Sequence, residues 1–222
     1  MGAIVDEISC LLETHANRDK VVSLASYVLK LWGATGKSPP LLTASARIAG
    51  TRATLRLFDD AAAVRALVRY GLGQKEGLLW GTMGVANGLF TLSYLQGEKL
   101  VWLLDTGVLK LSPELAERIR IAHKLFWSLS AFVGLVRSLR ALHLTALMLK
   151  SPGSPKCAPA RLTHASLTST KLLLDVIHAV SWLPRGWLWG EALTATQASA
   201  VATASAVFGL VMHYHGKRLL PR

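Results

Sequence analysis

One long uncharged stretch, residues 192–215, is the strongest feature of the hydropathy pattern. It contains no Asp, Glu, Lys, Arg or Pro. A helix of this length is roughly 36 Å long, enough to cross a hydrocarbon core of ~30 Å. Amphipathic rings precede it and cations follow it, as is typical of a lipid–water boundary: Trp182, Trp187, Trp189, Lys217, Arg218 and Arg222. The stretch predicts a transmembrane helix, with an alanine-rich core helix of a soluble protein as the alternative.

A second apolar stretch, residues 123–149, predicts another transmembrane helix. Its uncharged part, 125–136, is too short to span alone, because Arg137 and Arg140 follow it. A cation near the bilayer centre costs ~2.5–3.5 kcal/mol, so both arginines must snorkel, pair or face other helices. These two are the predicted intramembrane charges. Facing a water-filled path, they would mark a pore, but snorkelling of both side chains toward one membrane boundary is the preferred interpretation.

Residues 77–96 also lack charge and are nearly long enough to span. Four glycines fall on one face of this segment when it is drawn as a helix, and small residues so spaced allow close helix packing in lipid: Gly77, Gly81, Gly84 and Gly88. The segment is either a third membrane segment or a glycine-weakened, partly buried one. An amphipathic connector is expected at 98–111.

Residues 44–73 carry basic and apolar positions on different faces. The pattern predicts one imperfect amphipathic helix, or two with a bend near Asp59 and Asp60. We predict that it lies on anionic lipid, where a net charge of three contributes ~3 kcal/mol; a solvated basic helix is the alternative. The expected lipid contacts are Arg47, Arg52, Arg56, Arg65, Arg69, Ile48, Leu55 and Phe58.

The N-terminal region predicts two short amphipathic helices. Ile4, Val5, Ile8, Leu11 and Leu12 give the first its apolar stripe. The second is expected to begin at an N-cap, Asn17, and to end at Gly33 or Gly36. Residues 151–161, rich in proline, predict a linker, and 162–183 an apolar-faced helix.

Composition favours a membrane protein over a nucleic-acid binder. The 222 residues are 51% hydrophobic with a net charge of +12, and the mean hydropathy is +0.37. A chain both basic and apolar suits anionic phospholipid. Cys10 and Cys157 have no metal-type spacing and are expected to be free thiols. Early acidic residues argue against a secretory signal.

Chemical motifs are not evident. The histidines are scattered, and no phosphate loop, nucleophile elbow, paired-carboxylate site or metal spacing occurs. The pattern therefore predicts no enzyme, no cofactor and no metal site. A lipid-modifying membrane enzyme is the least supported interpretation, because the sequence contains no recognisable set of catalytic residues.

Taken together, the patterns predict an all-α, multi-helix integral membrane protein with amphipathic N-terminal helices and two membrane-spanning helices, or three if residues 77–96 also span. The expected divisions are 1–76 (amphipathic helices), 77–122 (membrane-associated segment and connector), 123–149 (span), 150–191 (linker and amphipathic helix), 192–215 (span) and 216–222 (basic tail).

Several sequence blocks resemble the peroxisomal membrane protein 11 family, its gamma type most closely. The blocks are residues 18–20 (Arg-Asp-Lys), 55–60 (Leu-Arg-Leu-Phe-Asp-Asp), 69–73 (Arg-Tyr-Gly-Leu-Gly), 101–109, 125–129 (Leu-Phe-Trp-Ser-Leu), 134–139, 182–186 (Trp-Leu-Pro-Arg-Gly) and 188–189.

The resemblance implies a multi-pass peroxisomal membrane protein with both termini in the cytosol and residues 150–191 in the lumen. It also implies elongation of the membrane before division, association with itself and with family members, and binding of adaptors of the dynamin fission machinery. The alternative function is a channel or metabolite carrier.

Overall fold

The computed structural model describes residues 6, 9, 12–153 and 155–219, and within these residues it contains helices but no strand. Most of the expected first helix, including Ile4, Val5, Ile8 and Leu11, lies outside the described residues, as do Cys10 and Arg222. The α-helices are α2 (His15–Thr35), α3 (Pro39–Leu55), α4 (Asp60–Tyr70), α5 (Leu78–Asp105), α6 (Pro113–Lys150), α7 (Ala158–Val180) and α8 (Ala195–Leu219), with short 3₁₀ helices η1 (Arg56–Phe58) and η2 (Gln74–Glu76).

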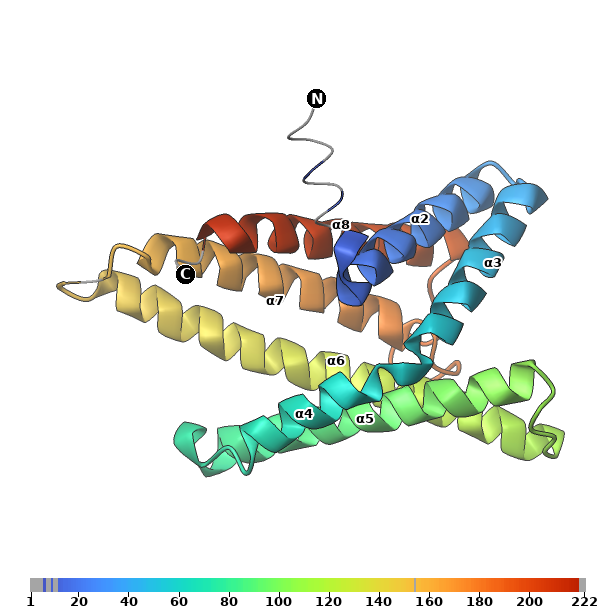
Figure 1. Cartoon of the computed structure of the whole chain (residues 1–222), viewed down its shortest axis with the longest axis horizontal. Coiled ribbons are helices and arrows are strands. Elements are labelled where there is room, and N and C mark those ends of the chain that lie inside the picture. Colours follow the sequence, from blue (N-terminus) through green and yellow to red (C-terminus); the bar gives the residue numbers. More distant parts are fainter. Residues whose placement is uncertain (1–5, 7–8, 10–11, 154, 220–222) are drawn as a thin grey trace.

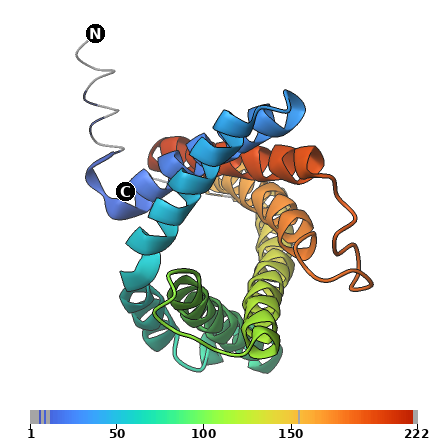
Figure 2. The ribbon, with the colours of Figure 1, turned by 90° about the vertical axis from the view of Figure 1, so that its right-hand side faces the viewer.

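The helices form a ring when they are viewed end on (Figure 2). Helix α2 packs on α3 and α8, α7 packs on α8 and α6, and α6 packs on α5. Helix α4 lies along the outside of α5 (Figure 1). The ring closes between α3 and α5 through polar side chains, among them Trp102, whose Nε1 donates to Thr54 Oγ1 at 3.0 Å.

Among the described residues, polar side chains are buried about as often as apolar ones. Serines such as Ser26 and Ser199 are buried, whereas many leucines, valines and aromatic residues are exposed. Polar side chains also join neighbouring helices: Thr91 with Ser130 at 2.8 Å, and Ser138 with Ser169 at 3.1 Å. Apolar residues outside and small polar residues between helices are typical of helices packed in lipid.

Two of the described helices are long and apolar enough to cross a membrane, α6 and the Ala195–Tyr214 part of α8. None of the most apolar window of α6 is buried inside the protein. Helix α5 is not among these candidates, so length and composition support two spans and give none to residues 77–96. The fold is therefore all-α, with two helices suited to spanning a bilayer.

Helix α5 differs from the expectation at its C-terminal half. The sequence pattern separated 77–96 from a connector at 98–111, but one helix continues to Asp105. Gly97 is accommodated because His123 of α6 packs against it; a Cβ there would stand 3.0 Å from the His123 Cβ. The charged residues that follow are held by partners on other helices, Glu98 by Arg56 and Lys99 by Asp60.

The other boundaries lie close to the pattern. Residues 44–73 contain two helices with a break at η1, beside the bend expected at Asp59 and Asp60. Helix α2 starts at His15, which places Asn17 in its first turn instead of at its N-cap, and it ends before Gly36. Cys157 is a free thiol at the N-cap of α7.

Candidate membrane interface

Helix α4 presents an apolar stripe and a basic stripe to the outside. Val64 and Val68 are exposed on one side of the helix, and Phe58 before the helix and Leu72 after it are exposed as well; these four residues are the α4 stripe. Phe58 is 84% exposed and Leu72 is 75% exposed, which is unusual for large apolar side chains in water. The stripe has the form of a surface that rests on another apolar medium.

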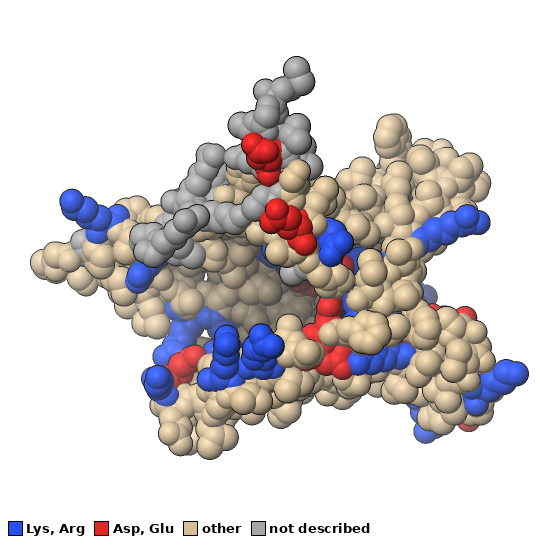
Figure 3. All heavy atoms as spheres, viewed as in Figure 1, with Lys and Arg blue, Asp and Glu red and all other residues tan. Residues whose placement is uncertain are grey.

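Arg65 and Arg69 form the basic stripe of α4. Both are exposed, and within the described part of the chain neither makes an ion pair with a carboxylate. At about 100° per residue they lie next to the Val64–Val68 stripe and away from the side that contacts α5. Basic side chains gather at the lower left of the molecule in Figure 3, where α4 and the start of α5 lie in Figure 1. The charges can therefore reach phosphates beside the apolar stripe.

Glycines on α5 give α4 its place. A Cβ on Gly88 would stand 2.6 Å from Leu67 Cδ1, and Gly84 lies directly under the ring of Tyr70. A Cβ on Gly81 would stand 2.7 Å from the Gly73 carbonyl oxygen. Small residues thus permit close helix contact, and the partner is α4. Gly77 takes no part in this contact; it precedes α5 with φ +84°.

Glu76 fixes the C-terminal end of this arrangement to α6. The Arg137 guanidinium lies 3.0 Å from Glu76 Oε1, and Arg140 lies 3.5 Å from Oε2. Arg137 also donates to Tyr70 Oη at 3.2 Å, and Arg140 lies over the Trp80 ring at 4.4 Å. The sequence allowed these arginines to snorkel to the membrane boundary, to pair with an acid or to face other helices. In the structure they pair with Glu76.

Asp60 fixes the N-terminal end of α4 to α5. Its carboxylate accepts hydrogen bonds from Lys99 and, at 3.0 Å, from Gln96. The hydrogen bond from Lys99 is the main reason that the pKa of Asp60 is below its usual value. Asp60 and Glu76 therefore hold the two ends of the same amphipathic helix.

Arg52 and Arg56 point into the protein instead of outward. Arg52 Nε donates to Asp19 Oδ1 at 2.6 Å and its Nη2 donates to Oδ2 at 3.1 Å. Arg56 lies 3.3 Å from Glu98 and donates to Tyr94 Oη at 3.2 Å. The lipid contacts expected of Arg52 and Arg56 stay a prediction. In the structure both side chains have protein partners, which compete with lipid phosphates for them.

The remaining predicted lipid contacts divide by exposure. Arg47, Leu55 and Phe58 are exposed, and Ile48 is half-buried. The sequence analysis placed a bend near Asp60 but did not predict that Asp60, Glu76 and Lys99 join α4 to its neighbours. A lone Glu76 beside two distant arginines carries no local signal, so only tertiary structure brings it to them.

Comparison with known proteins covers nearly the whole chain. The model of a family described as peroxisomal biogenesis factor 11 (PEX11) matches residues 5–213. Peroxisomal membrane protein 11C of Homo sapiens is 27% identical over 228 residues, which cover 94% of this chain and 93% of that protein. Peroxisomal membrane protein 11C of Mus musculus is 28% identical over 234 residues, covering 92% and 95%. No solved structure matches.

Proposed function

The chain belongs to the peroxisomal biogenesis factor 11 family of peroxisomal membrane proteins, and we propose that it bends the peroxisomal membrane by inserting α4 into one leaflet. The exposed stripe of Phe58, Val64, Val68 and Leu72 beside Arg65 and Arg69 carries the proposal. An amphipathic helix that wedges into one leaflet expands it relative to the other, which favours elongated membranes.

Helices α6 and α8 anchor α4 to the bilayer. Reversible adhesion by a short basic helix amounts to a few kcal/mol, whereas two spans hold it at the membrane permanently. Contacts of α4 with α5, and of α5 with α6, transmit this anchoring. In this proposal both termini lie in the cytosol, the segment between the spans lies in the lumen, and the chain itself has no enzymatic activity.

Self-association would concentrate the wedges. The exposed apolar side chains of α6, among them Phe132, Leu139 and Leu144, offer surface for other copies or family members in lipid. We further propose that such oligomers elongate peroxisomes and recruit adaptors of the dynamin-type fission machinery. Cysteine labelling at engineered positions 90, 115, 160 and 220 tests the topology on which this arrangement depends.

Charge reversal on α4 tests the proposed function. The full chain with Arg65→Glu and Arg69→Glu is reconstituted into vesicles containing anionic lipid, and vesicle shape is recorded by electron microscopy. Wild type is expected to elongate the vesicles and the variant is expected to leave them round. Arg161→Glu with Arg185→Glu, the same charge change at exposed positions between the spans, is the matched control. Equal elongation by wild type and the α4 variant would contradict the proposal.

Solute passage is a second candidate function, favoured by the cavities between the helices. The larger measures about 920 Å³. The smaller, about 490 Å³, is lined by Asn87, Ser130 and Arg137. Solute flux through reconstituted vesicles that Arg137→Ala abolishes would support a channel or carrier; wild-type vesicles without flux would count against it.

A further inference from the structure

The larger cavity lies at the centre of the helix ring. It measures about 920 Å³ and is lined by residues of α2, α3, α5, α6, α7 and α8. Figure 3 shows the surface hollowed between the layer of α7 and α8 and the layer of α4 and α5. A volume of this size falls in the range of sites that hold organic ligands.

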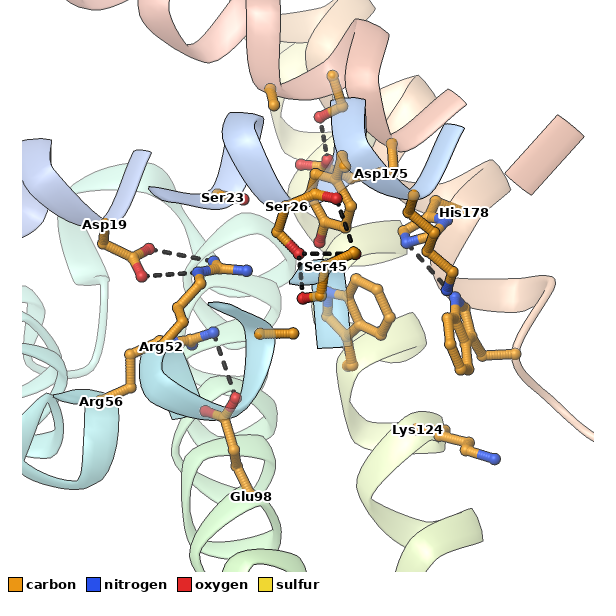
Figure 4. A pocket seen from close by; sticks show the side chains of 18 of the residues that line it. Asp19, Ser23, Ser26, Ser45, Arg52, Arg56, Glu98, Lys124, Asp175 and His178 are labelled. Atoms are coloured by element: carbon orange, nitrogen blue, oxygen red, sulfur yellow. Dashed lines mark hydrogen bonds and ion pairs between the residues drawn. The ribbon is translucent and has the colours of Figure 1, made fainter. Parts of the chain in front are cut away.

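Every carboxylate in the cavity lining is already occupied by a basic side chain. Figure 4 shows two of these pairs, Asp19 with Arg52 and Glu98 with Arg56. The other two pairs are Asp105 with Arg120 and Asp175 with Lys171. Each acidic group of the wall therefore already has a basic side chain at ion-pair distance.

Three lysines of the lining are left over. Among the described residues, no carboxylate lies within ion-pair distance of Lys20, Lys30 or Lys124. Lys20 only donates to Asn17 Oδ1 at 3.4 Å, and Lys30 lies over the Trp182 ring at 4.6 Å. Half-buried lysines without a carboxylate partner make the wall positively charged, so it favours an anion in the space.

Burial also disfavours the charged form of two of these lysines, Lys20 and Lys30. It lowers the pKa of Lys30, and together with the nearby charge of Lys171 it lowers the pKa of Lys20. A bound anion would raise both pKa values again, because opposite charge favours the ammonium form. The electrostatic attraction between these two lysines and a bound anion would therefore contribute favourably to the free energy of binding.

The spacing of the lysines defines the shape of that ligand. Lys20 and Lys30 lie about 15 Å apart along α2, too far for one small ion to contact both. Near Lys30, His178 is surrounded by Tyr27 at 5.7 Å, Trp127 at 5.5 Å and Trp182 at 6.0 Å between ring centroids. The cavity thus offers separated cations and a cluster of rings at one end.

We propose that this cavity binds an organic phosphate with at least two negative charges, its phosphoryl groups at Lys20 and Lys30 and its flat or apolar part against the rings around His178. Lysine acts as a point charge for phosphate, which suits a ligand that needs no fixed bidentate geometry. The shared chemistry is that of a phosphorylated lipid headgroup and of a soluble phosphate ester.

Two probes separate these sources. The full chain in nanodiscs of neutral lipid is titrated with adenosine 3′,5′-bisphosphate, a soluble phosphate ester with two separated phosphates, and with dibutanoyl phosphatidylinositol 4-phosphate, a soluble form of a lipid headgroup. Calorimetry gives the affinity, and the melting midpoint gives an independent reading. At least one probe is expected to bind, and Lys20→Gln and Lys30→Gln are each expected to weaken it fivefold or more.

Matched variants keep the result interpretable. Lys110→Gln makes the same change at an exposed lysine outside the cavity, and it is expected to leave binding unchanged. Lys30→Arg keeps the charge and should bind more tightly than Lys30→Gln. Binding of adenosine 3′,5′-bisphosphate alone assigns a soluble ligand, binding of the headgroup alone assigns a lipid, and binding of both assigns recognition of the phosphoryl groups themselves.

Absence of binding by both probes, or equal weakening by Lys110→Gln, would overturn the proposal. The membrane-bending proposal is tested separately, because neither Lys20 nor Lys30 belongs to the apolar or basic stripe of α4. Vesicle elongation by Lys30→Gln is expected to match wild type whatever the binding experiment gives.

Discussion

The Gly73 carbonyl oxygen occupies the space that a Cβ at position 81 would need, at 2.7 Å. The relationship is reciprocal: a Cβ on Gly73 would stand 2.6 Å from the Gly81 Cα, and Gly73 has φ +66°. Two backbones meet here without side chains between them. This contact sets how closely the turn after α4 lies against α5.

Gly81→Ala is therefore expected to push the turn away from α5 and to destabilise the fold by about 1–3 kcal/mol. Amide hydrogen exchange should rise over residues 60–76. Gly50→Ala is the control, since a Cβ at Gly50 meets nothing within 4 Å; it should be neutral or stabilising by up to ~1 kcal/mol. Equal effects of the two substitutions would contradict this account of the contact.

Glu76→Gln removes the acid that Arg137 and Arg140 share. The loss of partly exposed ion pairs is expected to cost about 1 kcal/mol, a roughly fivefold rise in exchange at the amides of 70–77. Glu114→Gln serves as the control, because it changes an exposed carboxylate at the start of α6, the helix that carries Arg137 and Arg140. Unchanged exchange in the Glu76 variant would show that α4 is held by packing alone.

Arg52 distinguishes a structural role from a lipid-binding role. Arg52→Glu places two carboxylates together, and we expect it to destabilise the fold by about 3 kcal/mol. Adding Asp19→Arg restores an ion pair with exchanged charges, so the melting midpoint should recover. Arg65→Glu should leave the midpoint unchanged. Failure of the exchanged pair to recover stability would argue that Arg52 acts through another contact.

His178 makes stability fall with acidity. Burial, assisted by the charge of Lys30 and opposed by Asp175, lowers the pKa of His178 to about 4 from an ordinary value of 6.5. The unfolded chain therefore takes up the proton first as pH falls. The contribution of His178 leaves the free energy of unfolding undiminished above pH 6.5. Between pH 6.5 and 4 this contribution lowers the free energy of unfolding progressively, by up to about 3 kcal/mol in total. Thermal unfolding across this range should show a smaller decline for His178→Phe than for wild type; parallel curves would refute the assignment.

Much of the fold could be predicted from periodicity, because it depends on local sequence. The apolar stretches at 123–149 and 192–215 correspond to α6 and α8, and the bend beside Asp59 corresponds to the break at η1. The continuity of α5 through Gly97 could not be predicted, because it depends on His123 of another helix.

The site was predictable only in part for the same reason. The pattern placed Gly81, Gly84 and Gly88 on one face, but a face does not name its partner. A helical projection predicts that Arg52 points outward. In the structure it points inward, because its partner Asp19 lies on α2. Charge pairs between distant segments leave no periodic signal, and they decide which arginines are free for lipid.

The depth of α4 in the bilayer decides whether this helix acts as a wedge in one leaflet. A spin label is attached at position 68 or 65 of the full chain, in a Cys10→Ser, Cys157→Ser background reconstituted into anionic vesicles. If α4 lies in the leaflet, the label at 68 collides with oxygen dissolved in the acyl chains, while the label at 65 collides with an aqueous nickel reagent. If both labels are reached equally by the aqueous reagent, α4 does not lie in the leaflet and the wedge mechanism is wrong.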